Sequence, residues 1–324
     1  MPEPAALGEF ERIARFFRPL TAGTPGALDL SDDAALLAPR PGHVLVVTVD
    51  ALVEGVHFRP EDPPDLVARK MLRVNLSDLA AMGADALGYV MTTALPRRCG
   101  EDWLAGFAAG LAADQAEFGV GLLGGDSVAT PGPITLSLTA FGEVPAGQAI
   151  RRNGARPGDG LFVTGTIGDG ALGLLALAGR LDFLDPAHRA FLADRYQLPR
   201  PRSGVGPALR GLARAMLDVS DGLLGDLAHI AETSCVAAEV DRDRVPLSPA
   251  GRAAVTRDPA LWDVVLGGGD DYELLFAATA GGVPEAIAGV PVTPIGRIVA
   301  GQGIRVLDGE GRSLTVAGTG YRHF

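Results

Sequence analysis

Residues 215–227 read Ala-Met-Leu-Asp-Val-Ser-Asp-Gly-Leu-Leu-Gly-Asp-Leu and carry several structural signals within one short segment. The apolar start predicts a short buried strand over 215–217, and apolar residues at helical spacing predict a helix from about Leu223. The acidic turn between them holds Asp218, Ser220, Asp221 and Gly222. Open α/β sheets bind ligands at this end of their strands, but a single side-chain oxygen is enough to cap a helix. A ligand or metal site and a simple cap therefore both stay open for this turn.

Acidic residues lie near the ends of other predicted elements as well. They are Asp33 before a predicted strand over 34–38, Asp50 at the end of a strand over 43–50, Asp126 after a strand over 120–123, and Asp78 within a helix over 64–82. Two carboxylates ~4 Å apart repel by ~4 kcal/mol at an effective dielectric constant of ~20. If these acids converge, cations must therefore separate them. Oxygen donors without His or Cys favour Mg²⁺, which completes its shell with water and phosphate oxygens.

Strands and helices alternate along both halves of the chain, which predicts a mixed α/β protein of two domains. A Pro-, Gly- and Arg-rich passage near 145–158 marks the boundary, so we expect domains at 1–148 and 149–324. The other predicted helices cover 9–20, 101–118, 171–178, 186–196 and 204–215, and a helical region covers 248–266. The other predicted strands cover 87–95, 133–144, 160–165, 236–240, 272–278, 292–299 and 303–307.

The composition narrows the function classes. A net charge of −11 over 324 residues argues against a nucleic-acid partner. Lys70 is the only lysine, and it does not lie in the Gly-rich setting of a P-loop. Cys99 and Cys235 lack the spacing of a zinc site. No apolar run reaches the ~18 residues of a membrane span, and the N-terminus lacks the pattern of a signal peptide, so we expect a cytoplasmic protein.

Other residues have both a functional and an ordinary interpretation. His57 lies in a loop where it either contacts a substrate or is incidental, and Arg152 either binds a phosphate or is solvated. The Gly-rich turn over 165–170 resembles a phosphate-binding turn, although one such turn is weak evidence. Asp270 and Glu273 flank Tyr272 and, by themselves, indicate an acidic strand edge.

The order of the motifs resembles that of the thiamine-monophosphate kinase family over nearly the whole chain. The matching segments are Glu9-Phe10 with Ile13, Asp32-Asp33, Asp50 with His57-Phe58, Val74-Asn-Leu-Ser-Asp-Leu-Ala-Ala-Met-Gly-Ala84, Gly124-Gly-Asp126, Arg152 with Gly154-Ala-Arg-Pro-Gly-Asp159, Leu217-Asp-Val-Ser-Asp-Gly222, Asp271-Tyr-Glu-Leu274 and Gly320-Tyr321. The segment around Asp78 is shared, in looser form, with aminoimidazole ribonucleotide synthetase and selenophosphate synthetase. His57 and the closing segments are similar to the thiamine enzymes in particular.

The resemblance implies an aminoimidazole ribonucleotide synthetase-like fold and a homodimer whose N-terminal domains join strands in a shared barrel. It implies an enzyme that makes thiamine diphosphate from thiamine monophosphate by direct in-line transfer of the ATP γ-phosphoryl group. It also implies an N-terminal domain for ATP, Mg²⁺ and dimerisation, and a C-terminal domain that completes the ATP and substrate site. Because the acceptor phosphate is already anionic, no catalytic general base is expected.

The resemblance also implies roles for individual residues. Those expected to hold several Mg²⁺ ions are Asp33, Thr48, Asp50, Asp78, Asp126, Asp218 and Asp221. Those expected to contact ATP are Gly125, Asp126, Arg152 and Ser220. Those expected to contact thiamine monophosphate are His57, Asp270 and Tyr321.

Three positions depart from the family pattern. Ser31 replaces a Gly before the Asp pair, and Val49 replaces a hydroxyl residue before Asp50. Asp270 replaces a Glu and is one methylene shorter. Two alternative functions stay open: another ATP-dependent synthetase of the same superfamily, which would form a different product, and a non-catalytic dimeric scaffold stabilised by metal ions.

Overall fold

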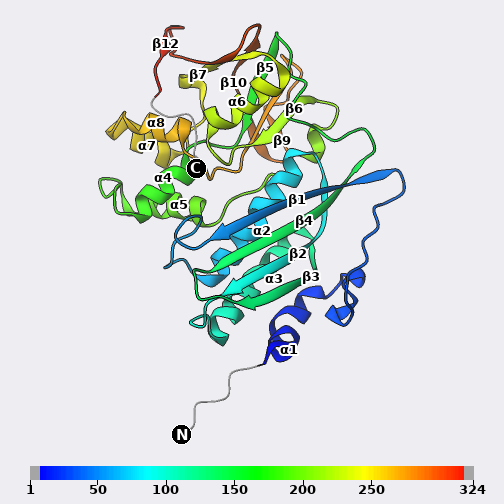
Figure 1. Cartoon of the computed structure of the whole chain (residues 1–324). Helices are drawn as coiled ribbons and strands as arrows, with labels where there is room; N and C mark the ends of the chain where they lie inside the picture. The colour runs from blue at the N-terminus through cyan, green and yellow to red at the C-terminus, as the bar shows by residue number, and fades with distance from the viewer. Residues whose placement is uncertain (1–7, 317–324) are drawn as a thin grey trace. The chain divides into compact units, whose positions relative to one another are not determined.

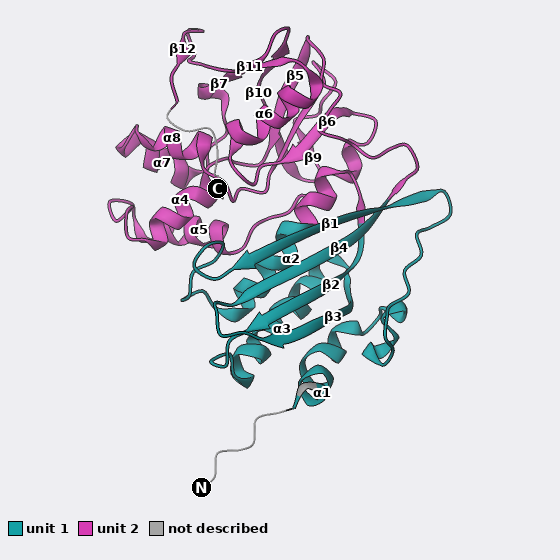
Figure 2. Cartoon of the chain, viewed as in Figure 1, with its two compact units in different colours: residues 1–75, 86–143 teal, residues 76–85, 144–324 magenta. Residues whose placement is uncertain are grey.

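The computed structural model describes residues 8–316 and divides the chain into two compact units. Unit 1 comprises residues 1–75 and 86–143, and unit 2 comprises residues 76–85 and 144–324 (Figure 2). Each unit is described by itself below. No helix within residues 8–316 is long and apolar enough to cross a membrane.

Unit 1 contains a four-stranded sheet in the order β1-β4-β2-β3 (Figure 1). Its strands are β1 (His43–Val53), β2 (Asp85–Leu95), β3 (Gly121–Ala129) and β4 (Thr135–Pro145). The long helices α2 (Pro64–Ala81) and α3 (Glu101–Phe118) cover one face of this sheet (Figure 1). The N-terminal elements are short: α1 (Glu9–Arg12), η1 (Ile13–Phe17), η2 (Arg18–Thr21) and η3 (Pro25–Leu30).

Local sequence explains the helix α3 well. Glu101 and Asp102 lie in its first turn, where negative charge complements the helix dipole. Gly119 ends the helix in a left-handed conformation with φ of 68°, which glycine adopts without steric cost. Leu104, Phe107 and Leu111 are buried at helical spacing. The helix predicted over 101–118 is therefore confirmed.

Unit 2 contains a mixed sheet in the order β12-β11-β7-β10-β5-β8-β6, with β9 paired to β10. The strands are β5 (Asp159–Thr164), β6 (Ala213–Asp218), β7 (Ala237–Asp241), β8 (Leu274–Thr279), β9 (Ala286–Ile287), β10 (Val290–Val299), β11 (Gly303–Leu307) and β12 (Ser313–Leu314). The helices are α4 (Asp169–Leu177), α5 (Pro186–Gln197), η4 (Pro207–Leu209), α6 (Leu223–Ser234), η5 (Arg242–Arg244), α7 (Pro249–Arg257) and α8 (Leu261–Gly267).

The core of unit 2 lies on both faces of this sheet. Every residue of β5 is buried, as expected for a central strand covered on each side. One face packs Leu161, Val163 and Leu275 against apolar residues of the helices. The other face includes Phe162 and Phe276, whose rings stack with centroids 5.4 Å apart. This core fixes β6 beside β8, and β6 ends at Asp218.

Three predicted elements were wrong. Residues 9–20 do not form one regular helix but pass from α1 into η1 and η2, because Pro19 cannot continue a helical hydrogen-bond ladder. Residues 34–38 form no strand. Residues 204–215 are not helical apart from η4, a segment that includes Gly204, Gly206, Pro207 and Gly211, which are poor helix formers.

Two predicted boundaries also move. The strand predicted over 120–123 continues to Ala129, so Asp126 lies within β3 and not in a turn after it. The strand predicted over 43–50 continues to Val53, which places Asp50 inside β1. Parallel pairing between β2 and β3 explains the first change, since Thr92 lies opposite Asp126 in the register.

A buried ion pair joins α2 to α3. The Arg73 guanidinium donates to both carboxylate oxygens of Asp114, at 2.7 and 2.8 Å, and the two side chains are fully buried. Arg73 also reaches Glu117 at 2.6 Å, but that carboxylate is half exposed. The Arg73–Asp114 pair therefore neutralises charge that the interior would otherwise not tolerate.

Asp114→Ala is expected to lower the free energy of unfolding by about 3 kcal/mol, because it removes a buried carboxylate from a buried guanidinium. Glu117→Ala is the matched control, and its half-exposed carboxylate should contribute less than about 1 kcal/mol. Urea denaturation followed by circular dichroism measures both. Equal effects for the two variants would contradict the role of burial.

Candidate active site

The acidic turn of unit 2 is fixed by a single carboxylate oxygen. Oδ2 of Asp226 accepts hydrogen bonds from the backbone N–H groups of Ser220, Asp221 and Gly222, at 3.0, 3.0 and 3.1 Å. Asp226 lies in the first turn of α6 and is buried. Burial raises the pKa of its carboxyl to about 7, against the effect of the backbone hydrogen bonds. The turn therefore keeps its shape through a side chain that the sequence analysis did not single out.

The turn presents Asp218 and Asp221 in different environments. Asp218 is the last residue of β6 and is largely buried, with its Oδ2 accepting a 2.6 Å hydrogen bond from Ser77 Oγ. Asp221 is partly exposed. Asp78, also in unit 2, follows Ser77 in the last part of α2 and is partly exposed. Ser77 thus places the end of α2 beside Asp218.

The Asp270 segment is hydrogen bonded directly to the acidic turn. The Asp270 N–H donates to Ser220 O at 2.9 Å, and the Tyr272 N–H donates to Val219 O at 2.8 Å. In the opposite direction the Val219 N–H donates to Glu273 O at 2.8 Å. The structure therefore brings Asp270, a predicted substrate contact, beside the predicted metal and ATP residues of this turn.

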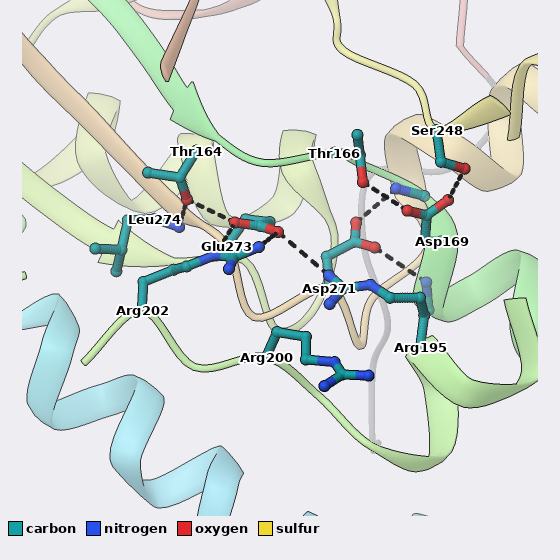
Figure 3. A network of polar contacts seen from close by, with 12 residues as sticks. Thr164, Thr166, Asp169, Arg195, Arg200, Arg202, Ser248, Asp271, Glu273 and Leu274 are labelled. Carbon is teal, nitrogen blue, oxygen red and sulfur yellow. Dashed lines mark hydrogen bonds and ion pairs between the residues drawn. The ribbon is translucent and has the colours of Figure 1, made fainter. Parts of the chain in front are cut away.

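A network of polar contacts includes Asp271 and Glu273 (Figure 3). The fully buried Glu273 carboxylate accepts from Thr164 Oγ1 at 2.7 Å, from Arg195 Nη2 at 3.2 Å and from Arg202 Nε at 2.6 Å. Asp271 is also buried, and burial raises its pKa well above the usual value. Glu273 is therefore a buried ion-pair partner and not part of an exposed acidic edge.

The Gly-rich turn over 165–170 resembles a phosphate-binding turn in sequence, but in the structure it binds a carboxylate of the chain itself. The N–H groups of Gly168 and Gly170 donate to the two oxygens of Asp271, at 2.7 and 3.1 Å. These donors lie at the N-terminus of α4, where a bound phosphate would otherwise accept from them. The carboxylate of Asp271 takes this place, so the turn does not act as a phosphate cradle.

In unit 1 one pocket collects several of the predicted residues. Its volume is about 190 Å³, and its lining includes Asp32, Asp33, Gly125 and Asp126. Gly125 also has a packing role, since a Cβ there would lie 2.1 Å from Met91 O on β2. Asp33 and Asp126 are both exposed, and they are brought to one pocket although the sequence separates them widely.

Thr48 and Asp50 lie two residues apart on β1, so their side chains point to the same face of the sheet. His57 follows β1, and its Nδ1 accepts a 3.0 Å hydrogen bond from the Val53 N–H. In the neutral imidazole this places the proton on Nε2.

The remaining predicted residues are less informative. Arg152 in unit 2 is exposed, and its carbonyl accepts from Thr233 Oγ1 at 3.1 Å. Tyr321 lies outside the described residues. Within residues 8–316, no group of three or more His, Cys, Asp or Glu side chains is arranged to hold a metal ion.

Sequence reasoning missed Ser77, Asp226 and Asp271 as supports of the site. A local signal existed for Asp226, because an acid in the first turn of a helix often accepts from the N–H groups before it. Ser77 immediately precedes Asp78, but its partner lies 141 residues away. Asp271 reaches Gly168 across 103 residues, and no local pattern indicates that contact.

Asp226→Ala should lower the free energy of unfolding by about 1–3 kcal/mol, because three backbone N–H groups lose their acceptor. Asp226→Asn keeps a carbonyl oxygen as acceptor and removes a buried charge. Its free energy of unfolding should therefore stay within about 1 kcal/mol of that of the unsubstituted protein. Urea denaturation and amide hydrogen exchange of residues 220–222 check this. An Asn variant as unstable as the Ala variant would show that the charge, and not the acceptor, matters.

Comparisons with known proteins agree with the motifs in these units. The model of the AIR synthase related protein N-terminal domain matches residues 31–144, and that of the C-terminal domain matches residues 156–309. The thiamine-monophosphate kinase of Caulobacter vibrioides is 47% identical over 330 residues, which cover 99% of this chain and 92% of that protein.

Solved structures give the same result. The thiamine-monophosphate kinase from Stenotrophomonas maltophilia K279a superposes with a TM-score of 0.83 at 43% identity, covering 95% of this chain and 98% of that one. A structure of AaThiL complexed with AMPPCP and TMP superposes with a TM-score of 0.78 at 29% identity, covering 98% and 97%. With both domain models matched and near-complete coverage at 47% identity, the chain belongs to the thiamine-monophosphate kinase family of AIR synthase related proteins.

Proposed function

We propose that this chain transfers the γ-phosphoryl group of ATP to thiamine monophosphate, giving thiamine diphosphate and ADP. The observation that carries this function is the 47% identity, over 99% of the chain, to a thiamine-monophosphate kinase. The related AaThiL structure, which is complexed with AMPPCP and TMP, supports the same pair of substrates. The acidic turn and the Asp270 segment, which are hydrogen bonded to each other within unit 2, contain several of the residues that we assign to this reaction.

The transfer is a direct in-line displacement. A phosphate oxygen of thiamine monophosphate attacks the γ-phosphorus, a new P–O bond forms, and the bond to the β-phosphate oxygen of ATP breaks as ADP leaves. The attacking oxygen is already anionic, so the protein contributes positioning and charge neutralisation instead of a general base. We assign Gly125, Asp126, Arg152 and Ser220 to ATP, and His57, Asp270 and Tyr321 to thiamine monophosphate.

The donor set fits Mg²⁺. The candidate ligands are oxygen donors that occur in small groups. Asp33 and Asp126 line one pocket, Thr48 and Asp50 lie on one strand, and Asp218 and Asp221 lie on one turn. Asp78 follows Ser77, whose Oγ donates to Asp218. Mg²⁺ uses one or two carboxylates and takes its other ligands from water and phosphates. When bound, the ions neutralise the developing charge of two polyanions and orient them.

The domain roles follow from these assignments. We assign ATP and Mg²⁺ contacts and dimerisation to the N-terminal domain, residues 1–148, and further ATP and substrate contacts to the C-terminal domain, residues 149–324. The compact units have nearly this division, except that residues 76–85, with Asp78, belong to unit 2.

We also propose a homodimer in which the N-terminal sheets join in a shared barrel. The support is β1, an edge strand of its sheet whose Val44, Leu45, Val47 and Val49 are 40–61% exposed. A long apolar edge strand is prone to pair with another chain, and burying these side chains would remove that exposure.

The first experiment incubates metal-stripped protein with ATP, thiamine monophosphate and Mg²⁺ and resolves the products by chromatography. Thiamine diphosphate and ADP should form in equal amounts only when Mg²⁺ is present. Asp50→Asn and Asp218→Asn should each abolish this activity while circular dichroism stays unchanged. A different phosphorylated product would favour another synthetase of the superfamily, and no ATP consumption would favour a scaffold.

The dimer is tested by sedimentation velocity. The protein should sediment as a particle of 2 × 33.4 = 66.8 kDa, twice the mass of one chain. Val49→Lys places a charge on the exposed face of β1 and should shift the protein toward the monomer, because a buried unpaired charge is costly. Phe191→Lys changes an exposed apolar residue on α5 and serves as the control. A monomer at every concentration would contradict the proposal.

A further inference from the structure

The segment 270–272 has an unusual backbone. Asp270 and Tyr272 both have positive φ, 68° and 52°, while Asp271 lies between them with a buried side chain. Left-handed conformations are uncommon for residues other than glycine, and a bulky residue such as Tyr adopts them only when its surroundings require it. Something in the structure must therefore impose this conformation.

One set of contacts comes from the acidic turn, through the N–H groups of Asp270 and Tyr272. These bonds hold the backbone of both left-handed residues to Ser220 and Val219, at 2.9 and 2.8 Å. These bonds connect the segment 270–272 only to the acidic turn. The carboxylate of Asp271 connects the segment to the Gly-rich turn as well, because it accepts hydrogen bonds from the N–H groups of Gly168 and Gly170.

The first turn of α4 also packs closely against the segment 270–272. A Cβ at Gly170 would lie 2.2 Å from Asp270 O, so the first turn of α4 touches the backbone of the segment. The Asp271 carboxylate is thus bonded to the same turn that packs against Asp270. Because both contacts involve backbone atoms, a change on either side must move the segment.

We propose that Asp271 is a positioning residue, whose bonds to Gly168 and Gly170 hold the left-handed segment 270–272 so that the Asp270 side chain meets thiamine monophosphate at a fixed place relative to the acidic turn. The inference rests on the proposed function, because Asp270 is assigned there to the thiamine substrate. Asp271 itself is buried, and its carboxylate is bonded to the backbone of the Gly-rich turn. Its effect on catalysis passes entirely through Asp270.

The buried carboxylate of Glu273 has a different role from that of Asp271. Its carboxylate is bonded to Thr164, Arg195 and Arg202, which lie on β5, on α5 and after α5 (Figure 3). It joins the start of β8 to those elements and lies against Gly165, where an added Cβ would be 2.1 Å from Glu273 Oε1. Asp271 is therefore the link between the segment 270–272 and α4.

Two variants of the full-length protein test the proposal by steady-state kinetics. Asp271→Asn replaces one acceptor oxygen by an NH₂ group, which cannot accept from a backbone N–H. Gly170→Ala leaves Asp271 intact but pushes against Asp270 O. Each should raise KM for thiamine monophosphate by about tenfold or more and change KM for ATP by less than about threefold.

Gly170→Ala separates the proposal from a merely structural role. Within a helix Ala is more favourable than Gly, so a role limited to starting α4 predicts unchanged kinetics. Asp243→Asn is the matched control for Asp271→Asn, since Asp243 also accepts from a backbone N–H, that of Gly309 at 3.0 Å, but is exposed. This control should have normal values of both constants.

The outcomes are distinct. Folded variants with unchanged constants, or with both KM values raised equally, would overturn the positioning role while the function stands. Failure of both variants to fold would make Asp271 a residue of the fold and would also overturn it. If the protein without substitutions forms no thiamine diphosphate, the proposed function is wrong, and the inference is wrong with it.

Discussion

Backbone N–H groups at the start of two helices donate to carboxylates of the chain itself, and the arrangement of unit 2 depends on these bonds. Asp226 accepts at the start of α6, and Asp271 accepts at the start of α4. Helix N-termini of this kind bind phosphate in many nucleotide enzymes. Here that capacity is used internally, and the only lysine, Lys70, is buried. The proposed binding of phosphate through Mg²⁺ ions held by aspartates is compatible with this arrangement.

The two carboxylates also connect the parts of the site in unit 2. Asp226 shapes the acidic turn, the turn bonds to the segment 270–272, and Asp271 joins that segment to α4. Phosphoryl transfer gains most of its rate from the placement of donor and acceptor, so a stiff frame of this kind suits the chemistry. Burial disfavours the charged form of both acids, and their backbone hydrogen bonds offset part of that cost.

The departures from the family pattern have local explanations. Ser31 has φ of −105°, so this position does not need the conformational freedom of glycine. Val49 points to the exposed face of β1, opposite to Thr48 and Asp50. Asp270 has φ of 68°, a conformation that Asp adopts more readily than most residues. Asp at position 270 is therefore compatible with the left-handed backbone conformation found there.

Local patterns in the sequence determined α3, most of α2 and the strand–turn–helix around Asp218, because periodicity and turn chemistry act over a few residues. They also indicated the acids of the site, and the family motifs indicated the reaction. Only the tertiary structure decided that β3 runs through Asp126, since pairing with β2 extends it. It likewise decided the partners of Ser77 and Asp271, whose contacts span 141 and 103 residues and leave no local trace. Such contacts depend on which segments the core brings together, and a pattern within a few residues contains no information about that.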